Sequence, residues 1–222
     1  KDIDLFLAIL AETSPDVSWI DPKVHKDELK KLTQLVIDNA NAVASLAEAG
    51  KSEEALATLA SVQILCANRE GAMGVAGWNR MVEQKLGMNA ANQWYLGRPV
   101  LVSSNDRTTG LYNGDVGIVC ANSDGSRVAA FSSTEEKFRF PVTRLPDVET
   151  VHALTIHKSQ GSEYEHAIVV LPAHESRILT RELLYTGATR ARTKLTIIAT
   201  PEVISLAVNS PIRRATGLAR RL

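Results

Sequence analysis

The sequence has few cysteines, no long apolar run and no net charge. Its two cysteines, Cys66 and Cys120, are too few and too unpatterned for a disulfide framework or a zinc site. No apolar run approaches the roughly 18 residues that a membrane span needs, and no signal peptide is visible, so we expect a cytoplasmic protein without a membrane partner. Its 25 basic and 25 acidic residues cancel. No global field therefore attracts nucleic acid, and any DNA contact must be local.

A phosphate loop and its usual magnesium-binding strand are also missing. Gly50-Lys51-Ser52 resembles the end of the G-x-x-x-x-G-K-[ST] pattern, but Ser45 stands where the first glycine is required. A helical pattern precedes it where a strand is needed, so we interpret these residues as a helix end followed by a capped helix start. No apolar strand ends in acidic residues that could hold Mg²⁺. The sequence therefore offers no metal site of its own.

What is present suits one α/β domain with a smaller second domain. The chain has 222 residues, of which 45% are hydrophobic, enough for a substantial core. It begins at Lys1 without an initiating Met, which we expect of a piece of a longer protein. Apolar residues at helical spacing predict helices over 27–49, 52–60 and 74–86, and a buried strand over 62–67.

Between residues 97 and 146 the pattern changes to short apolar runs separated by turns. Asn113-Gly114 and Asp124-Gly125 are typical of hairpin turns. The sequence predicts a small antiparallel barrel inserted into the α/β domain, with strands near 99–102, 116–119, 128–131 and 138–140.

Two further apolar runs, 166–171 and 195–199, are typical of parallel strands buried on both faces. A polar block lies before each run: Thr155-Ile-His-Lys-Ser-Gln-Gly-Ser-Glu163 before the first and Glu182-Leu-Leu-Tyr-Thr-Gly-Ala-Thr-Arg190 before the second. Thr180 is expected to cap the helix that carries Arg190. Polar groups at the ends of strands in an open α/β sheet are where ligands bind.

These two blocks resemble motifs V and VI of the superfamily 1 helicases. Their exact residues resemble those of the RecD family, the alpha subunits of exonuclease V. The segment 68–79 resembles the region around motif IV of that family, and 111–118 resembles part of its SH3-like barrel. The resemblance implies a RecA-like parallel-sheet domain over 61–96 and 147–222, with an SH3-like β-barrel insertion over 97–146. Residues 1–60 are then an N-terminal helical segment.

The resemblance implies a catalytic and ATP-binding group of residues. Arg190 corresponds to the arginine finger, a task that suits a guanidinium because it stays charged and can fork onto phosphate oxygens. Arg69 corresponds to a second phosphate sensor, and Glu163 to an acceptor for the nucleotide ribose. Gln160 and Gly161 complete the ATP-binding group, since glycine lets the backbone approach a ligand closely. Alternatively, Arg190 is a surface arginine and Arg69 pairs with a carboxylate.

A second group of residues is implied for the single-stranded DNA channel. Thr155, His157 and Lys158 match motif V residues that can donate hydrogen bonds to phosphates. Arg181 lies at a helix start where phosphate could bind, and Asn79 could position the strand. For His157 a purely structural role is the alternative.

Together these features predict the C-terminal motor domain of an ATP-dependent 5′–3′ DNA helicase that acts in double-strand break repair. Its partners would be single-stranded DNA and the RecB and RecC subunits. ATP and Mg²⁺ would be held mainly by an N-terminal half, so we expect this piece alone to bind neither tightly and to be inactive. One alternative is a non-catalytic DNA- or partner-binding assembly module centred on the barrel. Another is the equivalent domain of a different superfamily 1 helicase, such as a conjugative relaxase-helicase.

Overall fold

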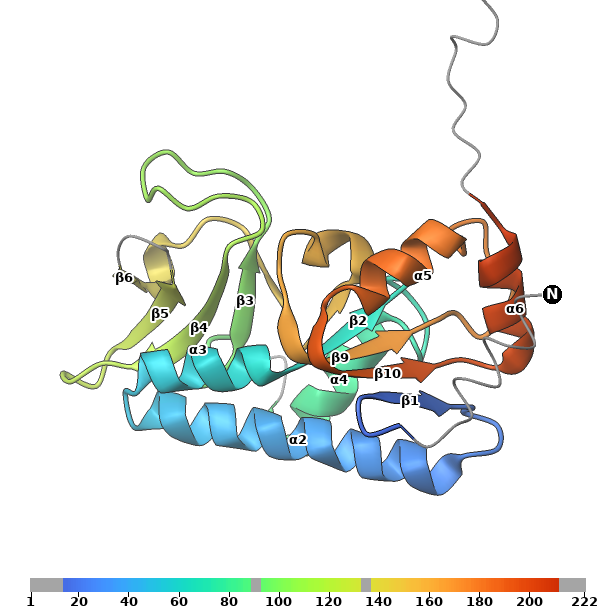
Figure 1. The fold of residues 1–222 in the computed structure, drawn as a ribbon. Helices are drawn as coiled ribbons and strands as arrows, with labels where there is room; N and C mark the ends of the chain where they lie inside the picture. The colour runs from blue at the N-terminus through green and yellow to red at the C-terminus, as the bar shows by residue number, and fades with distance from the viewer. Residues whose placement is uncertain (1–13, 89–92, 133–136, 212–222) are drawn as a thin grey trace, which may run out of the picture.

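The computed structural model describes residues 14–88, 93–132 and 137–211, which form two β-sheets joined by shared helices (Figure 1). The outer parts of the predicted N-terminal and C-terminal segments, residues 1–13 and 212–222, lie outside the described residues. Within the described ranges no helix is long and apolar enough to cross a membrane.

The larger sheet has five strands, all parallel to their neighbours. Its order is β1 (Val17–Ile20), β10 (Ala191–Ile198), β9 (Tyr164–Val170), β2 (Val62–Cys66) and β8 (Ala153–Thr155). The strands expected near 62–67, 166–171 and 195–199 are confirmed. This sheet is consistent with the predicted RecA-like domain.

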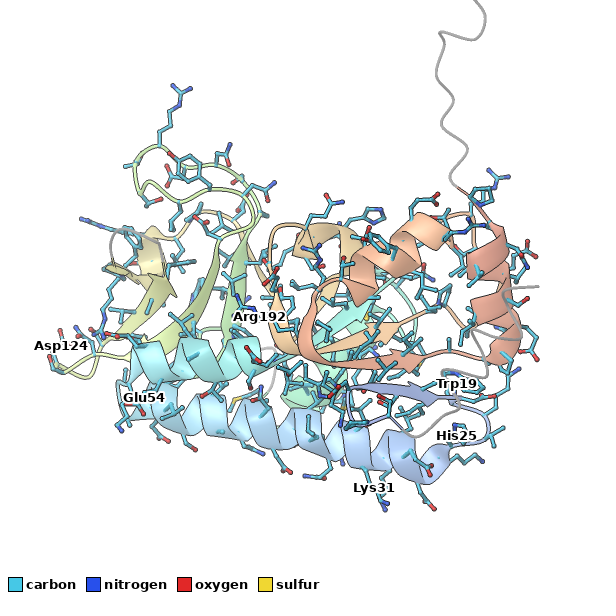
Figure 2. The ribbon with its side chains drawn as sticks, in the orientation of Figure 1. Trp19, His25, Lys31, Glu54, Asp124 and Arg192 are labelled. Atoms are coloured by element: carbon cyan, nitrogen blue, oxygen red, sulfur yellow. The ribbon has the colours of Figure 1, made fainter. Side chains whose placement is uncertain are left out.

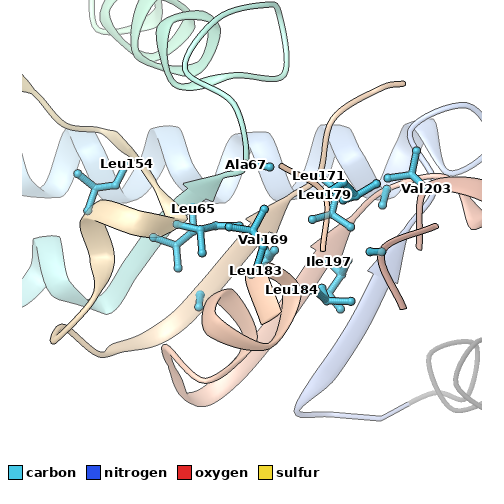
Figure 3. Close-up of a cluster of buried hydrophobic side chains, with 14 of the residues drawn as sticks. Leu65, Ala67, Leu154, Val169, Leu171, Leu179, Leu183, Leu184, Ile197 and Val203 are labelled. Atoms are coloured by element: carbon cyan, nitrogen blue, oxygen red, sulfur yellow. The ribbon is translucent and has the colours of Figure 1, made fainter. Parts of the chain in front are cut away.

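Helices cover both faces of the parallel sheet, which explains its uninterrupted apolar strands. On one face, Ile168 and Val170 pack with residues of α2 (Lys26–Glu48) and α4 (Val75–Lys85). On the other face, Val169 packs with residues of α5 (Arg181–Ala188) and α6 (Pro201–Asn209). Figure 3 shows this second cluster, in which Val169 lies among Leu65, Leu183 and Leu184. The predicted helices near 27–49 and 74–86 are confirmed as α2 and α4.

The smaller sheet has five strands, antiparallel throughout. Its order is β6 (Lys137–Pro141), β5 (Arg127–Ser132), β4 (Val116–Ala121), β3 (Pro99–Val102) and β7 (Val148–Thr150). The expected runs all lie in strands, and Asp124-Gly125 lies between the paired strands β4 and β5. β6 and β7 stand at the two ends of this order, so closure into an SH3-like barrel stays a prediction.

The other predicted turn, Asn113-Gly114, does not join two strands directly. A backbone hydrogen bond of 3.0 Å from Asp115 N to Tyr112 O closes a turn at the end of a longer connection between β3 and β4. The prediction of a tight hairpin here was wrong, because residues 103–111 form their own small loop with a bridge between Asp106 and Leu111.

α2 supports both sheets, as Figure 1 shows. The part of α2 up to Ala40 contributes Val36 and Ala40 to the core under the parallel sheet, and the part that follows contributes Val43 and Ala47 to a core with β4 and β5. Gly97, which has φ of +83°, lies against α2 so closely that a Cβ there would be 2.5 Å from the Cα of Ala44. The two sheets are therefore held on one long helix.

Several local features differ from the sequence predictions. β1 lies at the edge of the parallel sheet beside β10, although residues 1–60 were expected to be a helical segment. Gly50, with φ of +72°, ends α2 as expected. Ser52, however, does not cap α3 (Ser52–Ser61): Lys51 is the cap residue, and the buried Ser52 hydroxyl accepts a hydrogen bond from Arg139 instead.

Candidate functional site

The parallel strands divide the predicted site residues between two opposite edges of the sheet. Thr155 ends β8, and it lies level with Cys66 at the end of β2, three residues before Arg69. Glu163 and Arg190 instead precede β9 and β10, whose first residues Tyr164 and Ala191 are paired. We call the side of the sheet at the carboxyl ends of its strands the C-terminal edge, and the side at their amino ends the N-terminal edge. Seven residues of β9 separate them, a distance of roughly 20 Å at about 3.3 Å per residue.

At the N-terminal edge, the Arg190 guanidinium is held by three neutral oxygen atoms. Its Nε donates to the Thr186 carbonyl, Nη1 to the Ser162 carbonyl and Nη2 to the Thr189 hydroxyl, each at 3.1 Å. None of these acceptors is a carboxylate, so none of them offsets the positive charge. This arrangement fits an anionic ligand such as a phosphate group. Arg190 lies just beyond the end of α5, whose cap residue is Thr189, so it follows the helix that was predicted to carry it.

Glu163 lies beside Arg190 but is engaged with another arginine. Its carboxylate accepts a hydrogen bond from Arg192 Nε at 3.0 Å, and Arg192 Nη1 also lies 3.7 Å from Glu165 Oε1. Figure 2 labels Arg192. Gly161 has φ of +89°, a conformation that favours glycine, and both it and Gln160 are exposed. The backbone turn at Gly161 therefore delivers Ser162 and Glu163 to this edge.

A cavity of about 610 Å³ opens next to the N-terminal edge, between α3 and the antiparallel sheet. Leu56 and Phe131 give it apolar walls, while Gln63, Ser162 and Glu163 supply polar groups. It thus connects the side chain predicted to contact ribose with the space between the two sheets.

At the C-terminal edge, two cations share one carboxylate. Arg69 Nη2 lies 3.0 and 3.1 Å from the two oxygens of Glu149, and Lys158 Nζ lies 2.9 Å from Oε2. Burial would raise the pKa of Glu149, but hydrogen bonds and charges from Lys158 and Arg69 outweigh it and hold that pKa below its ordinary value. For Arg69, the alternative of an ion pair is what the structure shows. Arg69 therefore lies beside Lys158 at the C-terminal edge, whereas Arg190 lies at the N-terminal edge.

Thr155 and His157 complete this edge. The Thr155 hydroxyl accepts a hydrogen bond from the Lys158 backbone amide at 3.3 Å and caps the short helix Ile156–Ser159, labelled η2. His157 is exposed on that helix. The structure therefore brings Thr155, His157 and Lys158 together, as a shared role requires.

Asn79 and Arg181 both form hydrogen bonds with the backbone of other elements. Asn79 donates to the Thr150 carbonyl at 2.8 Å and accepts from the Ala153 amide at 2.9 Å, which fixes α4 to the connection between β7 and β8. Arg181 donates to the Val208 carbonyl at 2.8 Å, near the end of α6. The Thr180 hydroxyl caps α5 as expected, accepting from Leu183 N at 3.2 Å. DNA contacts by Asn79 and Arg181 stay predictions.

A buried polar cluster lies beside the start of β8 (Ala153–Thr155), and its grouping was not predicted from the sequence. The Tyr95 hydroxyl is 2.8 Å from His152 Nε2 and 3.2 Å from a Glu83 carboxylate oxygen. Arg98 donates to the Thr150 hydroxyl at 2.9 Å and lies over the Trp94 ring. Burial, with the nearby charge of Arg98, lowers the pKa of His152 to about 3. No sequence pattern links Glu83 on α4 with Tyr95 and His152, which lie in separate parts of the chain.

The described ranges contain no group of three or more His, Cys, Asp or Glu side chains arranged to hold a metal ion. Cys66 and Cys120 are both buried free thiols.

Comparison with known proteins identifies relatives that span this chain. Residues 150–198, which span both polar blocks, match the UvrD-like helicase C-terminal domain. The whole chain is 42% identical to the RecBCD enzyme subunit RecD of Mycolicibacterium smegmatis and 39% identical to that of Mycobacterium tuberculosis, covering 39% and 38% of those proteins. The RecD subunit of Haemophilus influenzae is 36% identical over 73% of this chain and 25% of its own length.

The chain thus spans about two fifths of the mycobacterial relatives it matches. Among solved structures, Pif1 helicase from Candida albicans is 14% identical, with a TM-score of 0.43 over 85% of this chain and 57% of that chain. The matches along the whole chain, with the helicase domain match across both polar blocks, show that the chain belongs to the RecD family.

Proposed function

We propose that this chain is the C-terminal motor domain of an ATP-dependent DNA helicase of the RecD type. The observation that carries the proposal is the division of its cationic residues between two edges of one parallel sheet. Arg190 stands at one edge, and Arg69 with Lys158 at the other. A motor needs this separation, because it must contact nucleotide and DNA at the same time.

The N-terminal edge would act on the nucleotide. Arg190 exchanges its three neutral acceptors for the γ-phosphate of ATP, because the opposite charges and the two-pronged fit of a guanidinium on phosphate make these bonds stronger than its bonds to neutral oxygens. As an arginine finger it stabilises the charge that develops during phosphoryl transfer. Glu163 accepts hydrogen bonds from the ribose, with Gln160 and Gly161 beside it.

The C-terminal edge would hold single-stranded DNA. Thr155, His157 and Lys158 donate to backbone phosphates, and we assign Arg69 to this group because it lies beside Lys158. This assignment replaces the sequence-based interpretation of Arg69 as a sensor of the nucleotide phosphate.

The wider role follows the relatives, which are named as subunits of the RecBCD enzyme. We propose translocation in the 5′–3′ direction, a role in double-strand break repair, and RecB and RecC as partners. ATP and Mg²⁺ would be bound mainly by parts of the full-length protein outside this chain.

The test is the ATPase activity of the full-length protein with Arg190 replaced. Arg190→Ala should lower kcat at saturating ATP and DNA by roughly 10³-fold or more, the range typical of arginine fingers. Arg190→Lys should restore little, because an ammonium cannot reproduce the planar fork. Arg144→Ala, which removes an exposed arginine from the antiparallel region, is the matched control. A kcat for Arg190→Ala within about threefold of wild type would contradict the finger assignment.

The isolated chain offers a second test. It should show no ATP turnover, and it should bind single-stranded DNA weakly and with a shallow salt dependence, since it can contact only a few phosphates. Submicromolar affinity at physiological salt would instead favour the binding-module alternative.

A further inference from the structure

Glu149 reaches the C-terminal edge from the other sheet. It lies on β7 of the antiparallel sheet, whereas Arg69 follows β2 and Lys158 lies on the short helix after β8. Both of its carboxylate oxygens contact Arg69, and one also contacts Lys158. One anion thus engages two cations from two other elements, as a bridging phosphate oxygen pair would.

The three side chains remain accessible to a ligand. The exposed fractions are 62% for Arg69, 41% for Glu149 and 31% for Lys158. Ion pairs this exposed contribute little net stability, so an incoming anion can replace the carboxylate at small cost.

The backbone that carries Glu149 is fixed. Its neighbours Val148 and Thr150 are paired with Val102 and Val100 of β3, and the Thr150 carbonyl accepts a hydrogen bond from Asn79. Exchange of Glu149 for a phosphate therefore requires a rotation of its side chain only, with no movement of either sheet.

We propose that Glu149 is an internal competitor for the phosphates of single-stranded DNA. In the free protein it occupies Arg69 and Lys158, and a backbone phosphate of the strand displaces it. The consequence is a moderate affinity, which lets the strand be released as readily as it is bound. This inference rests on the proposed function, because it refines how the DNA edge works.

The charge balance gives the expected effect. With Glu149 the three side chains carry a net charge of +1, and Glu149→Gln raises it to +2 while keeping the shape of the side chain. A neutral amide competes far less for a guanidinium than a carboxylate does. The affinity for single-stranded DNA should rise roughly 3- to 10-fold at low salt. The slope of log K against log salt concentration should become steeper by about 0.7, the value for one additional neutralised phosphate on a single strand.

The experiment measures binding of a fluorescent oligothymidylate to the full-length protein, without nucleotide, over a range of salt concentrations. Glu149→Gln and Glu149→Ala are compared with Glu54→Gln, which removes an exposed carboxylate of α3 that pairs with Lys51, the cap residue of that helix. Figure 2 labels Glu54. The Glu149 variants should both bind more tightly, and Glu54→Gln should not. Combining Glu149→Gln with Arg69→Ala and Lys158→Ala should abolish the gain.

Two further measurements separate the possible failures. Affinity for a fluorescent nucleotide should be unchanged in Glu149→Gln, which distinguishes DNA phosphates from those of ATP. Thermal unfolding checks that the variants remain folded. The tighter binding is expected to include a slower dissociation of the oligonucleotide, because Glu149 no longer competes with the bound phosphate. Unchanged or weaker DNA binding by both folded Glu149 variants would overturn the inference. If Arg69→Ala and Lys158→Ala also leave DNA binding unchanged, the DNA edge of the proposed function fails with it.

Discussion

The two edges of the parallel sheet satisfy their cations in different ways. At the N-terminal edge, Arg190 donates only to carbonyl and hydroxyl oxygens. At the C-terminal edge, Arg69 and Lys158 share the carboxylate of Glu149. An arginine held by neutral groups keeps its full attraction for an incoming anion, whereas one held by a carboxylate must exchange one anion for another. Under the proposed function, the first arrangement suits a strong interaction with a nucleotide, and the second suits weak interactions with DNA that form and break repeatedly.

Both edges depend on the same supporting helix. α2 packs beneath both the parallel sheet and the antiparallel sheet. Glu149 of the antiparallel sheet also forms an ion pair with Arg69, which follows β2 of the parallel sheet. Changes to this support should affect both edges, whereas changes to one edge should leave the other intact.

The largest effect on stability is expected from Gly97→Ala. It should disturb both edges together, because Gly97 packs on the helix that supports both sheets. The new methyl group would lie 2.5 Å from the backbone of α2 at Ala44, in a left-handed conformation of φ +83°. We expect a loss of roughly 3 kcal/mol or more in the free energy of unfolding. Gly87→Ala is the matched control, because its φ is +71° but nothing lies within 4 Å; it should cost only about 1 kcal/mol. Denaturant unfolding of both variants checks this, and equal losses would contradict close packing at Gly97.

A smaller effect is expected from His152→Gln, through the pH dependence of stability. Burial lowers the pKa of His152 from 6.5 to about 3 in the folded protein. Between these values the unfolded chain binds a proton that the folded protein does not, so stability falls as the pH falls from 6.5 toward 3.

Glutamine does not titrate. Between pH 7 and pH 5 the free energy of unfolding should therefore fall by about 2 kcal/mol less in His152→Gln than in wild type. Unfolding curves at several pH values measure the difference. His166, whose pKa burial lowers to about 4, should supply similar acid sensitivity in both proteins. Identical pH profiles would show that His152 is protonated equally in the folded and unfolded states.

Removal of single cations should sharpen the comparison at the C-terminal edge. Arg69→Ala and Lys158→Ala should each weaken binding of single-stranded DNA about 3- to 10-fold, and each should make the salt dependence shallower by about 0.7 for every phosphate that is no longer neutralised. The effect is moderate because each cation is already partly neutralised by Glu149. Fluorescence anisotropy in the full-length protein gives both quantities. An unchanged salt slope in both variants would mean that neither cation binds phosphate.

The smallest effect is expected at Glu163. Glu163→Gln removes the charged acceptor that we propose for ribose and should raise KM for ATP about threefold, within the range for loss of one hydrogen bond. The DNA affinity should not change, because Glu163 lies at the opposite edge from the residues proposed to bind DNA. Initial rates over a series of ATP concentrations provide the measurement. A loss of DNA affinity with a normal KM for ATP would contradict the proposed ribose contact of Glu163.

The strands of the parallel sheet could be predicted because burial on both faces requires continuous apolar runs such as 166–171. β1 could not, since Val17-Ser-Trp-Ile20 contains no such run and gains its place only by pairing with β10. The antiparallel strands were found from their turns and short apolar runs. The connection before β4 was misjudged because an Asn-Gly pair also ends longer loops.

The division of the site could not be predicted from its motifs. Thr155 and Glu163 belong to one continuous block of sequence, yet the chain crosses from one edge of the sheet to the other between them. The pairing of Arg69 with Glu149 joins residues 80 positions apart. It depends on how β7 is placed beside the parallel sheet, which no local pattern encodes.

The most direct test of the two-edge account measures two quantities in two variants of the full-length protein. Arg190→Ala should lower kcat for ATP hydrolysis by roughly 10³-fold while leaving the nucleotide-free affinity for single-stranded DNA within about twofold of wild type. Lys158→Ala should do the reverse, weakening DNA binding while kcat at saturating DNA stays within about threefold. If both variants lower both quantities to a similar extent, the edges do not have separate roles and the account is contradicted.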